Sequence, residues 1–193
     1  DVGDIISEDF NAGIDTVRTS INYTVADNVE NVEIIANVTG VKITGNALSN
    51  KVTASNLGDV INGMAGDDHF VLNNSNLYNT YLNGGTGNDK ISFSSLQANS
   101  YIKLGDFSKI TDIENVDFSG NLSQSLSISS SSILNITSGG GVINIVMDSS
   151  DNIFVTQGEF YSVNAFGSKY TFYDTDPALG GAHVIATANV TVV

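Results

Sequence analysis

The sequence predicts an all-β protein: a parallel β-roll, or β-solenoid, of nonapeptide repeats followed by a β-rich carboxy-terminal block. Two observations support this prediction. The first observation is the composition. β-branched residues are separated every few positions by Asn, Gly and Asp, and the 193 residues include 19 Gly but only 1 Pro. Such a pattern is typical of short strands joined by tight turns. The other is a period of nine residues, which is the mark of a repeat architecture.

The period is visible in the apolar positions and in the turns between them. Every ninth residue is apolar at six successive positions: Val25, Ile34, Ile43, Val52, Ile61 and Phe70. Four nonapeptides carry turn residues ahead of these positions, and the last is a complete G-G-x-G-x-D-x-U-x motif: GNALSNKVT at 45–53, ASNLGDVIN at 54–62, GMAGDDHFV at 63–71 and GGTGNDKIS at 84–92. We expect each nonapeptide to form a turn of about six residues and a strand of about three.

Two nonapeptides make one coil, so equivalent positions lie two repeats apart. The turns at 45–50, 63–68 and 84–89 are then expected along one edge of the roll, and those at 54–59 and 72–80 along the other.

One interval departs from the period. Phe70 and Ile91 are 21 residues apart, which is two nonapeptides plus three. We expect residues 72–83 to form a half-coil with a three-residue insertion, in which Leu82 takes the apolar position. The register of the roll would then continue through the insertion.

The turns contain the groups that calcium prefers. Calcium takes six to eight oxygen ligands and accepts backbone carbonyls together with carboxylates, whereas magnesium demands a stricter octahedron. A glycine-rich turn exposes carbonyls and its Asp adds charge, so two stacked turns can complete a cage. Ordinary Asn/Asp-Gly turns that hold no ion are the alternative.

These motifs resemble the RTX family, the hemolysin-type calcium-binding repeat proteins exported by type I secretion. The resemblance implies an ion held between turns one coil apart by alternate carbonyls and by the Asp at the sixth position of each turn. Carried over to the best pair, GMAGDD with GGTGND, it implies these calcium ligands: the carbonyls of Gly63, Ala65, Gly85 and Gly87 and the carboxylates of Asp68 and Asp89.

The departures from the motif limit the number of sites. Met64 replaces the second glycine of one turn, and Asn50 replaces the Asp of another. On the opposite edge Asp59 is correctly placed, but its partner turn at 72–80 lacks both glycines and an acid, so Asp59 is expected to be a weaker ligand. We expect one strong calcium site and one or two weaker ones.

The resemblance extends along the chain and divides it into three parts. Residues 1–42 contain phrases such as GIDTV and NVENVE and are expected to form degenerate lead-in coils, ahead of a calcium-binding roll at 43–92. Residues 93–193 are expected to form a β-rich carboxy-terminal domain that resembles the terminal block of large adhesins and holds a type I secretion signal if 193 is the true terminus. Within it, the serine-rich run at 119–141 predicts strands with one polar face, or alternatively a disordered linker.

Charge and residue usage exclude several classes. Twenty-one acidic and 7 basic residues give a net charge of -14, which disfavours nucleic acid and favours a cationic partner. The chain has no Cys and no apolar run long enough to cross a membrane, and because it opens with DVGDIISEDF we expect a piece of a longer protein. We expect no catalysis, since the two histidines, His69 and His183, belong to no catalytic motif.

The expected function is that of a calcium-stabilised extracellular module in a large secreted or cell-surface repeat protein of the adhesin type. Calcium is scarce in the cytosol, so the resemblance implies a chain that stays extended for export and folds outside. Its expected partners are calcium ions and either further copies of itself or cell-surface ligands. Two alternatives remain: a self-assembling subunit of a surface layer or biofilm matrix, and the export module of a secreted hydrolase.

Overall fold

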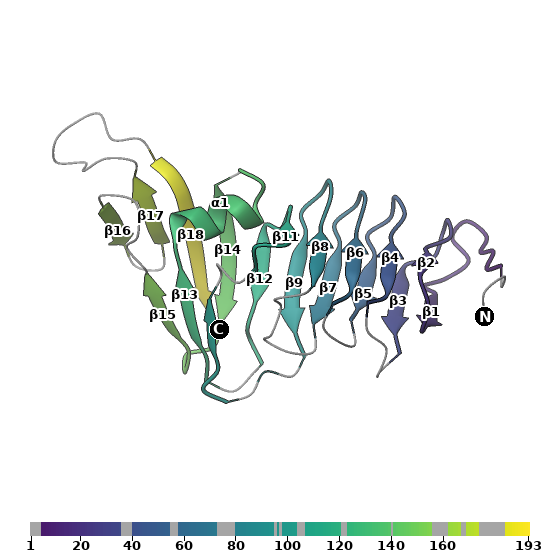
Figure 1. The fold of residues 1–193 in the computed structure, drawn as a ribbon, viewed down its shortest axis with the longest axis horizontal. Helices are drawn as coiled ribbons and strands as arrows, with labels where there is room; N and C mark the ends of the chain where they lie inside the picture. The colour runs from purple at the N-terminus through teal and green to yellow at the C-terminus, as the bar shows by residue number, and fades with distance from the viewer. Residues whose placement is uncertain are drawn as a thin grey trace.

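The computed structural model describes most of the chain. The described residues are 5–35, 40–54, 58–72, 80–94, 96, 98–103, 107–120, 123–139, 141–155, 162–166, 169–173 and 184–193. Strands dominate them, most strand pairs are parallel, and α1 (Ser130–Ile136) is the one helix among them. The prediction of an all-β parallel solenoid is confirmed, and Figure 1 shows its coils stacked along the long axis of the molecule. The described helix is far too short to cross a lipid bilayer.

The largest sheet, sheet A, runs the length of the stack. In spatial order its strands are β1 (Thr16–Thr19), β3 (Asn31–Ile34), β5 (Lys51–Thr53), β7 (His69–Leu72), β9 (Lys90–Phe93), β12 (Asn115–Asp117), β14 (Val142–Met147), β18 (Val184–Val192), β17 (Lys169–Tyr173) and β16 (Ser162–Phe166). Neighbours from β1 to β18 pair in parallel, because each coil returns the chain to the same face in the same direction. The last three strands pair antiparallel.

Two smaller sheets form the other faces of the solenoid. Sheet B contains β2 (Tyr23–Thr24), β4 (Lys42–Thr44), β6 (Val60–Asn62), β8 (Tyr81–Asn83) and β11 (Ile110–Thr111), all parallel. The third sheet contains β10 (Tyr101–Lys103), β13 (Ser125–Ile128) and β15 (Asn152–Val155). The amino-terminal coils therefore have two strands each, and the coils from β9 onward add a third segment.

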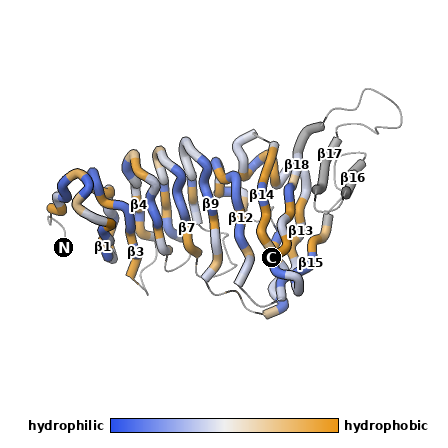
Figure 2. Tube along the Cα trace, turned by 180° about the vertical axis from the view of Figure 1, so that it is seen from behind, coloured by the Kyte–Doolittle hydropathy of each residue, from blue (hydrophilic) through white to orange (hydrophobic). Residues whose placement is uncertain are grey.

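The core is a stack of apolar side chains from successive strands, pointing into the coil. All six residues of the nine-residue register are buried, and so are Leu82 and Ile91. Val52 pairs with Phe70 and then Ile91 follows, while Leu82 pairs with Ile61. The predicted register through the three-residue insertion is thus confirmed. Figure 2 shows the resulting alternation of hydrophobic and hydrophilic residues along the coils.

The register differs in the first coils. There Val32, not Ile34, lies opposite Val52, and Tyr23, not Val25, lies opposite Ile43. The reason is coil length, since 20 residues rather than 18 separate the equivalent positions Glu30 and Asn50. Val25 and Ile34 remain buried one pleat further along their segments.

Sheet A continues without a break past residue 92, where the nonapeptide motif ends. The coil lengthens along the chain, from 18 residues between Asn50 and Asp68 to 21, 25 and 29 in the next three coils. Residue 92 therefore marks the end of the repeat motif but not the end of the stack.

The serine-rich run corrects one prediction. Residues 125–128 form strand β13 as expected, but the next serines begin α1, whose Ser129 caps the helix by accepting from the Ser132 N–H. Ser residues favour this position because their hydroxyl satisfies a free N–H of the first turn. Ile133 and Ile136 of this helix are buried. In space α1 lies beside β11, in the place of a further strand of sheet B, and the Ile113 N–H donates to the Ile136 carbonyl.

Candidate metal site

The predicted turns stack along one edge of the solenoid. The Gly66 N–H donates to the Thr86 carbonyl at 2.9 Å, and the Thr86 N–H donates to the Met64 carbonyl at 3.0 Å. Ala65 and Thr86 form a parallel bridge between the two turns. The turn at 45–50 lies one coil before, linked by the Ala65 N–H to the Asn46 carbonyl.

A column of buried polar side chains follows this edge at the sixth position of each turn. Oδ1 of Asp68 accepts the Asn50 N–H at 2.7 Å, and Oδ1 of Asp89 accepts the Asp68 N–H at 2.8 Å. Glu114 continues the column, with its Oε2 accepting the Asp89 N–H at 2.8 Å. Each acid therefore binds the backbone of the coil before it with one oxygen.

The second oxygens of the two central acids have no hydrogen-bond partner. Asp68 and Asp89 are 1% and 0% exposed, and Oδ2 of each is buried without a donor. A buried carboxylate oxygen with no partner is costly, so each is a candidate for an interaction with a cation.

The first glycines of the turns leave room beside these oxygens. A Cβ atom on Gly63 would lie 2.1 Å from the Asp68 Oδ2 and 2.3 Å from the Gly84 carbonyl oxygen. A Cβ on Gly84 would lie 2.6 Å from the Asp89 Oδ2. No residue with a side chain fits at either position, so the motif's first glycine is required by the inward carboxylate.

The carbonyls that the family resemblance selects accept no hydrogen bond from the described residues. These oxygens belong to Gly63, Ala65, Gly85 and Gly87, while the intervening carbonyls of Met64 and Thr86 accept the bonds that join the turns. The stack therefore uses the Met64 and Thr86 carbonyls, whereas the four selected carbonyls, like those of Gly66 and Gly84, accept nothing from the described residues. Carbonyl and carboxylate oxygens together are the donor set that suits calcium.

Burial raises the pKa values of the two acids. The pKa of the Asp68 carboxyl is raised to about 7, mainly by burial and also by the neighbouring Asp89 and Asp67, while the Asn50 N–H acts in the opposite direction. The pKa of Asp89 is raised to about 6, again mainly by burial, with added repulsion from Glu114. Both groups are more easily protonated than ordinary aspartates, because burial disfavours the charged carboxylate.

The departures from the motif have visible consequences. Met64 adopts the left-handed conformation, φ 79°, with an exposed side chain, so its backbone bends as the missing glycine would. Asn50 uses its amide within the fold: Nδ2 donates to the Val29 carbonyl at 3.2 Å and the Glu30 carbonyl at 3.3 Å. The side chain of Asn50 is therefore hydrogen-bonded within the protein, and its position in the column needs no ion.

The opposite edge holds Asp59. Its side chain is fully buried, and Oδ1 accepts the Val41 N–H at 3.1 Å, in the same manner as the Asp68 column. Most of its partner turn, residues 73–79, lies outside the described residues, so the weaker site stays a prediction.

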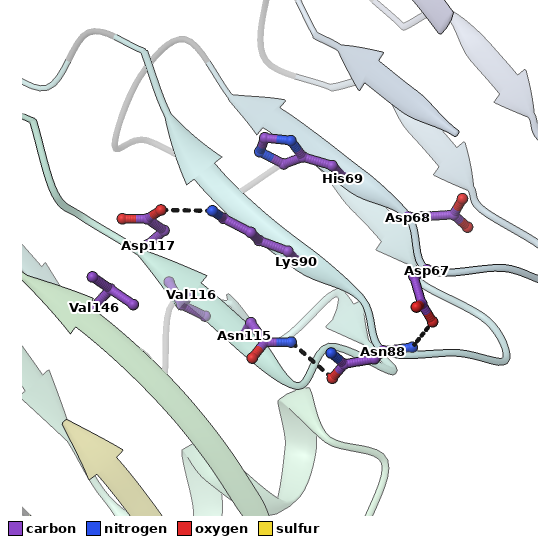
Figure 3. Close-up of a pocket in the computed structure, with 9 residues that line it drawn as sticks. All are labelled: Asp67, Asp68, His69, Asn88, Lys90, Asn115, Val116, Asp117 and Val146. Carbon is purple, nitrogen blue, oxygen red and sulfur yellow. Dashed lines mark hydrogen bonds and ion pairs between the residues drawn. The ribbon is translucent and has the colours of Figure 1, made fainter. Parts of the chain in front are cut away.

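The outer face of sheet A beside these turns is polar and internally paired. A groove of about 390 Å³ lies over β7, β9 and β12, and Figure 3 shows Asp67 at its border accepting the Asn88 N–H at 2.8 Å. A ladder of Asn side chains connects the turn to the carboxy-terminal coils. Each Nδ2 donates a hydrogen bond of 2.9 to 3.1 Å to the Oδ1 of the Asn before it: Asn88, Asn115, Asn144 and Asn189.

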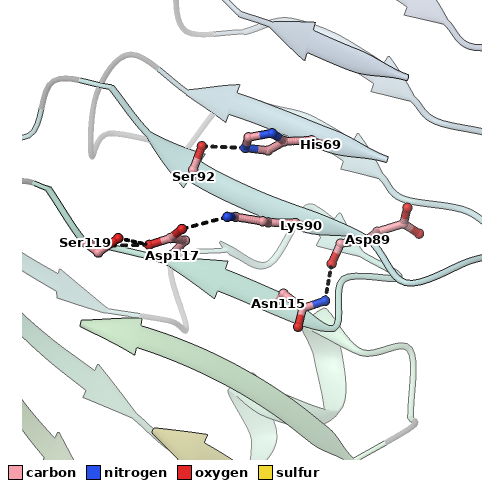
Figure 4. Close-up of polar contacts among 7 residues, drawn as sticks. All are labelled: His69, Asp89, Lys90, Ser92, Asn115, Asp117 and Ser119. Carbon is pink, nitrogen blue, oxygen red and sulfur yellow. Dashed lines mark hydrogen bonds and ion pairs between the residues drawn. The ribbon is translucent and has the colours of Figure 1, made fainter. Parts of the chain in front are cut away.

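His69 lies on this same face. Its Nε2 is 2.7 Å from the Ser92 hydroxyl, and Lys90 pairs with Asp117 at 2.7 Å (Figure 4). Burial and the charges of Lys90 and Lys51 lower the pKa of His69. The side chain is half-buried rather than solvated, and His183 lies outside the described residues.

Two acids near the site, Asp112 and Glu114, were absent from the sequence-based ligand set. They belong to the segment TDIE at 111–114, which has no glycine and therefore no visible repeat. The pairing of Val116 with Ile91 places this segment directly after the turn at 84–89. The apolar residues just before NVDF could have indicated this next coil. Because the coil is 25 residues long, a step of nine or eighteen residues does not reach them.

Comparisons place the chain with no known group: no family model matches it, and neither characterised proteins nor solved structures show significant similarity. Within the described ranges, no three Asp, Glu or His side chains gather as a metal-binding group. A cation between the turns at 63–68 and 84–89 would therefore draw two carboxylates and otherwise backbone oxygens.

Proposed function

We propose that this chain is a calcium-stabilised β-roll module of a large secreted or cell-surface repeat protein of the adhesin type, related to the RTX family. One observation carries the proposal: two stacked glycine-rich turns each leave a buried carboxylate oxygen and several backbone carbonyls without a hydrogen bond from the described residues. Calcium bound there would be held by Asp68 and Asp89 and by the carbonyls of Gly63, Ala65, Gly85 and Gly87. Its chemistry is charge neutralisation, not catalysis.

Calcium would couple folding to location. The chain carries a net charge of -14, and the buried carboxylates repel one another without a counter-ion. In calcium-poor cytosol this repulsion disfavours the compact roll, and in the extracellular medium bound calcium removes it. This behaviour suits a protein that is exported unfolded by type I secretion and folds at the cell surface.

The test is a set of thermal unfolding curves at pH 7.5 in 5 mM calcium, in 5 mM magnesium and in a chelator. We expect calcium to raise the unfolding temperature well above its value in chelator. Magnesium should have much less effect, because it requires a strict octahedron of ligands and gives up its bound waters reluctantly. Identical curves in all three solutions would contradict the proposal.

A second candidate function is a self-assembling surface-layer or matrix subunit. It is favoured by β16, the edge strand of sheet A beyond β17. Exposed strand edges readily pair with another chain. Calcium-dependent growth of large particles in light scattering would favour this candidate, and a stable monomer would reject it.

A further inference from the structure

The outer face of sheet B differs from the rest of the molecule in charge. Strands alternate their side chains between the two faces, so the residues flanking the buried Ile43, Ile61 and Leu82 point outward. One outward row follows β4, β6, β8 and the start of β11, and we call it the lysine–tyrosine row: Lys42, Val60, Tyr81 and Lys109. A second row beside it is neutral and polar: Thr24, Thr44, Asn62, Asn83 and Thr111.

Neither row contains a carboxylate, although acids outnumber bases 21 to 7 in the chain. Asp59 precedes Val60 in sequence but is buried, with its Oδ1 bound to the Val41 N–H. Asp112, in the turn after β11, accepts a hydrogen bond from the Asn83 amide at the border of the face.

The lysines of this row form no ion pair with any described residue. The Lys109 ammonium instead lies 4.5 Å from the centre of the Tyr81 ring. On sheet A, Lys90 is paired with Asp117 at 2.7 Å and Arg18 with Glu33 at 3.0 Å, whereas Lys51, like the two lysines of the row, pairs with no described residue. Two of the seven basic residues are therefore available on one face.

We propose that the lysine–tyrosine row binds an extended anionic polysaccharide. Lys42 and Lys109 are three strand spacings apart, roughly 14 Å at about 4.8 Å per spacing. One small anion cannot contact both lysines, whereas a chain of acidic sugars can bind one lysine at each end. Between them Val60 and Tyr81, 38% and 50% exposed, present an apolar platform.

The chemistry of the face favours sugar over an acidic protein partner. Tyr81, half exposed, offers an aromatic ring and a hydroxyl, which suit the apolar faces and hydroxyl groups of pyranose rings. The neighbouring row adds hydroxyl and amide groups, which both donate and accept hydrogen bonds.

The inference goes beyond the proposed calcium role, because none of these residues is a candidate metal ligand. Its test is therefore done on chain shown by circular dichroism to be folded, at one fixed calcium concentration. Failure of the calcium proposal would then appear in the unfolding curves and not in the sugar titration.

The probe is an oligogalacturonate of about eight residues, titrated calorimetrically, with a neutral dextran oligomer of equal length for comparison. Because galacturonate itself binds calcium, the heat of the same oligomer titrated into the calcium buffer alone is subtracted. We expect binding of the acidic oligomer alone, weakened several-fold by 0.5 M NaCl. Tyr81→Ala and Lys109→Gln should each weaken it roughly five- to tenfold. Lys51→Gln removes the same charge from sheet A and should leave the affinity within about twofold.

Three results would overturn the proposal. The first is the absence of binding at millimolar oligogalacturonate by a folded chain. The second is an equal loss in Lys51→Gln and Lys109→Gln, which would show attraction by overall charge and not by this face. The third is self-association in sedimentation that Lys109→Gln abolishes, which would make an acidic face of a second copy the occupant.

Discussion

Replacing Asp89 with Asn separates the two roles of this side chain in the column. The amide keeps an oxygen that can accept the Asp68 N–H, now at 2.8 Å, and removes the charge of the partnerless Oδ2. Asn50 shows that an amide fits this position two column steps away, where its Oδ1 accepts the Asn46 N–H of its own turn at 3.0 Å. The substitution therefore preserves the fold while deleting a charged ligand.

The expected effect changes sign with calcium. A rise of the Asp89 pKa from 3.8 to about 6 corresponds to roughly 3 kcal/mol at a pH above both values, as an upper bound. In chelator at pH 8 we expect Asp89→Asn to stabilise the protein by about 1 to 2 kcal/mol. Calcium at about 100 times its dissociation constant adds roughly 2.7 kcal/mol to the original chain, so there the variant should be the less stable one.

The assay is urea unfolding followed by circular dichroism, in chelator and in calcium. The control is Asp67→Asn, which makes the same charge change in the same turn but at an exposed carboxylate that binds the Asn88 N–H. We expect no reversal of sign for the control. If Asp89→Asn changes stability in the same direction in both solutions, the side chain serves the turn and not an ion.

Three further predictions follow from the same edge. Met64→Gly should raise stability by roughly 0.5 to 1 kcal/mol in urea unfolding, because glycine relieves the left-handed strain and Met64→Ala does not; equal effects of the two would contradict this. Asn50→Asp should add a second calcium in calorimetric titration and lower stability in chelator, and an unchanged stoichiometry would count against the column. Because the pKa values of Asp68 and Asp89 are raised in the folded state, the calcium-free chain should lose stability as pH rises from about 4 to 7, whereas calcium affinity should increase; pH-dependent unfolding with flat profiles would refute this.

The nine-residue step predicted the stack where one coil is two nonapeptides long. Between Asn50 and Asp68 the coil has 18 residues, two nonapeptides, and the apolar spacing alone places Ile61 and Phe70. Beyond Ile91 the coil lengthens to 25 and then 29 residues, so no fixed step finds Val116. Strand pairing continues there, because each strand of sheet A offers its free backbone groups to the next strand whatever the length of the coil between them.

The site was predictable to a similar extent. The glycine and Asp positions in the sequence identified the two turns that stack and the two carboxylates whose Oδ2 atoms have no hydrogen bond. This was possible because only glycine fits beside the inward carboxylate. Glu114 continues the column through a longer side chain and without any glycine, so motif spacing could not find it. The helix α1 was missed because Ser is common both in strands with a polar face and at helix caps.

Equilibrium dialysis against calcium at pH 7.5 tests the central claim most directly, with the double variant Asp68→Asn, Asp89→Asn beside the original chain. We predict that the original chain binds about one calcium ion tightly at submillimolar concentration, and that the double variant, shown to be folded, loses this ion. The absence of calcium binding by the original chain, or equal binding by both chains, would contradict the assignment of the stacked turns as a calcium site.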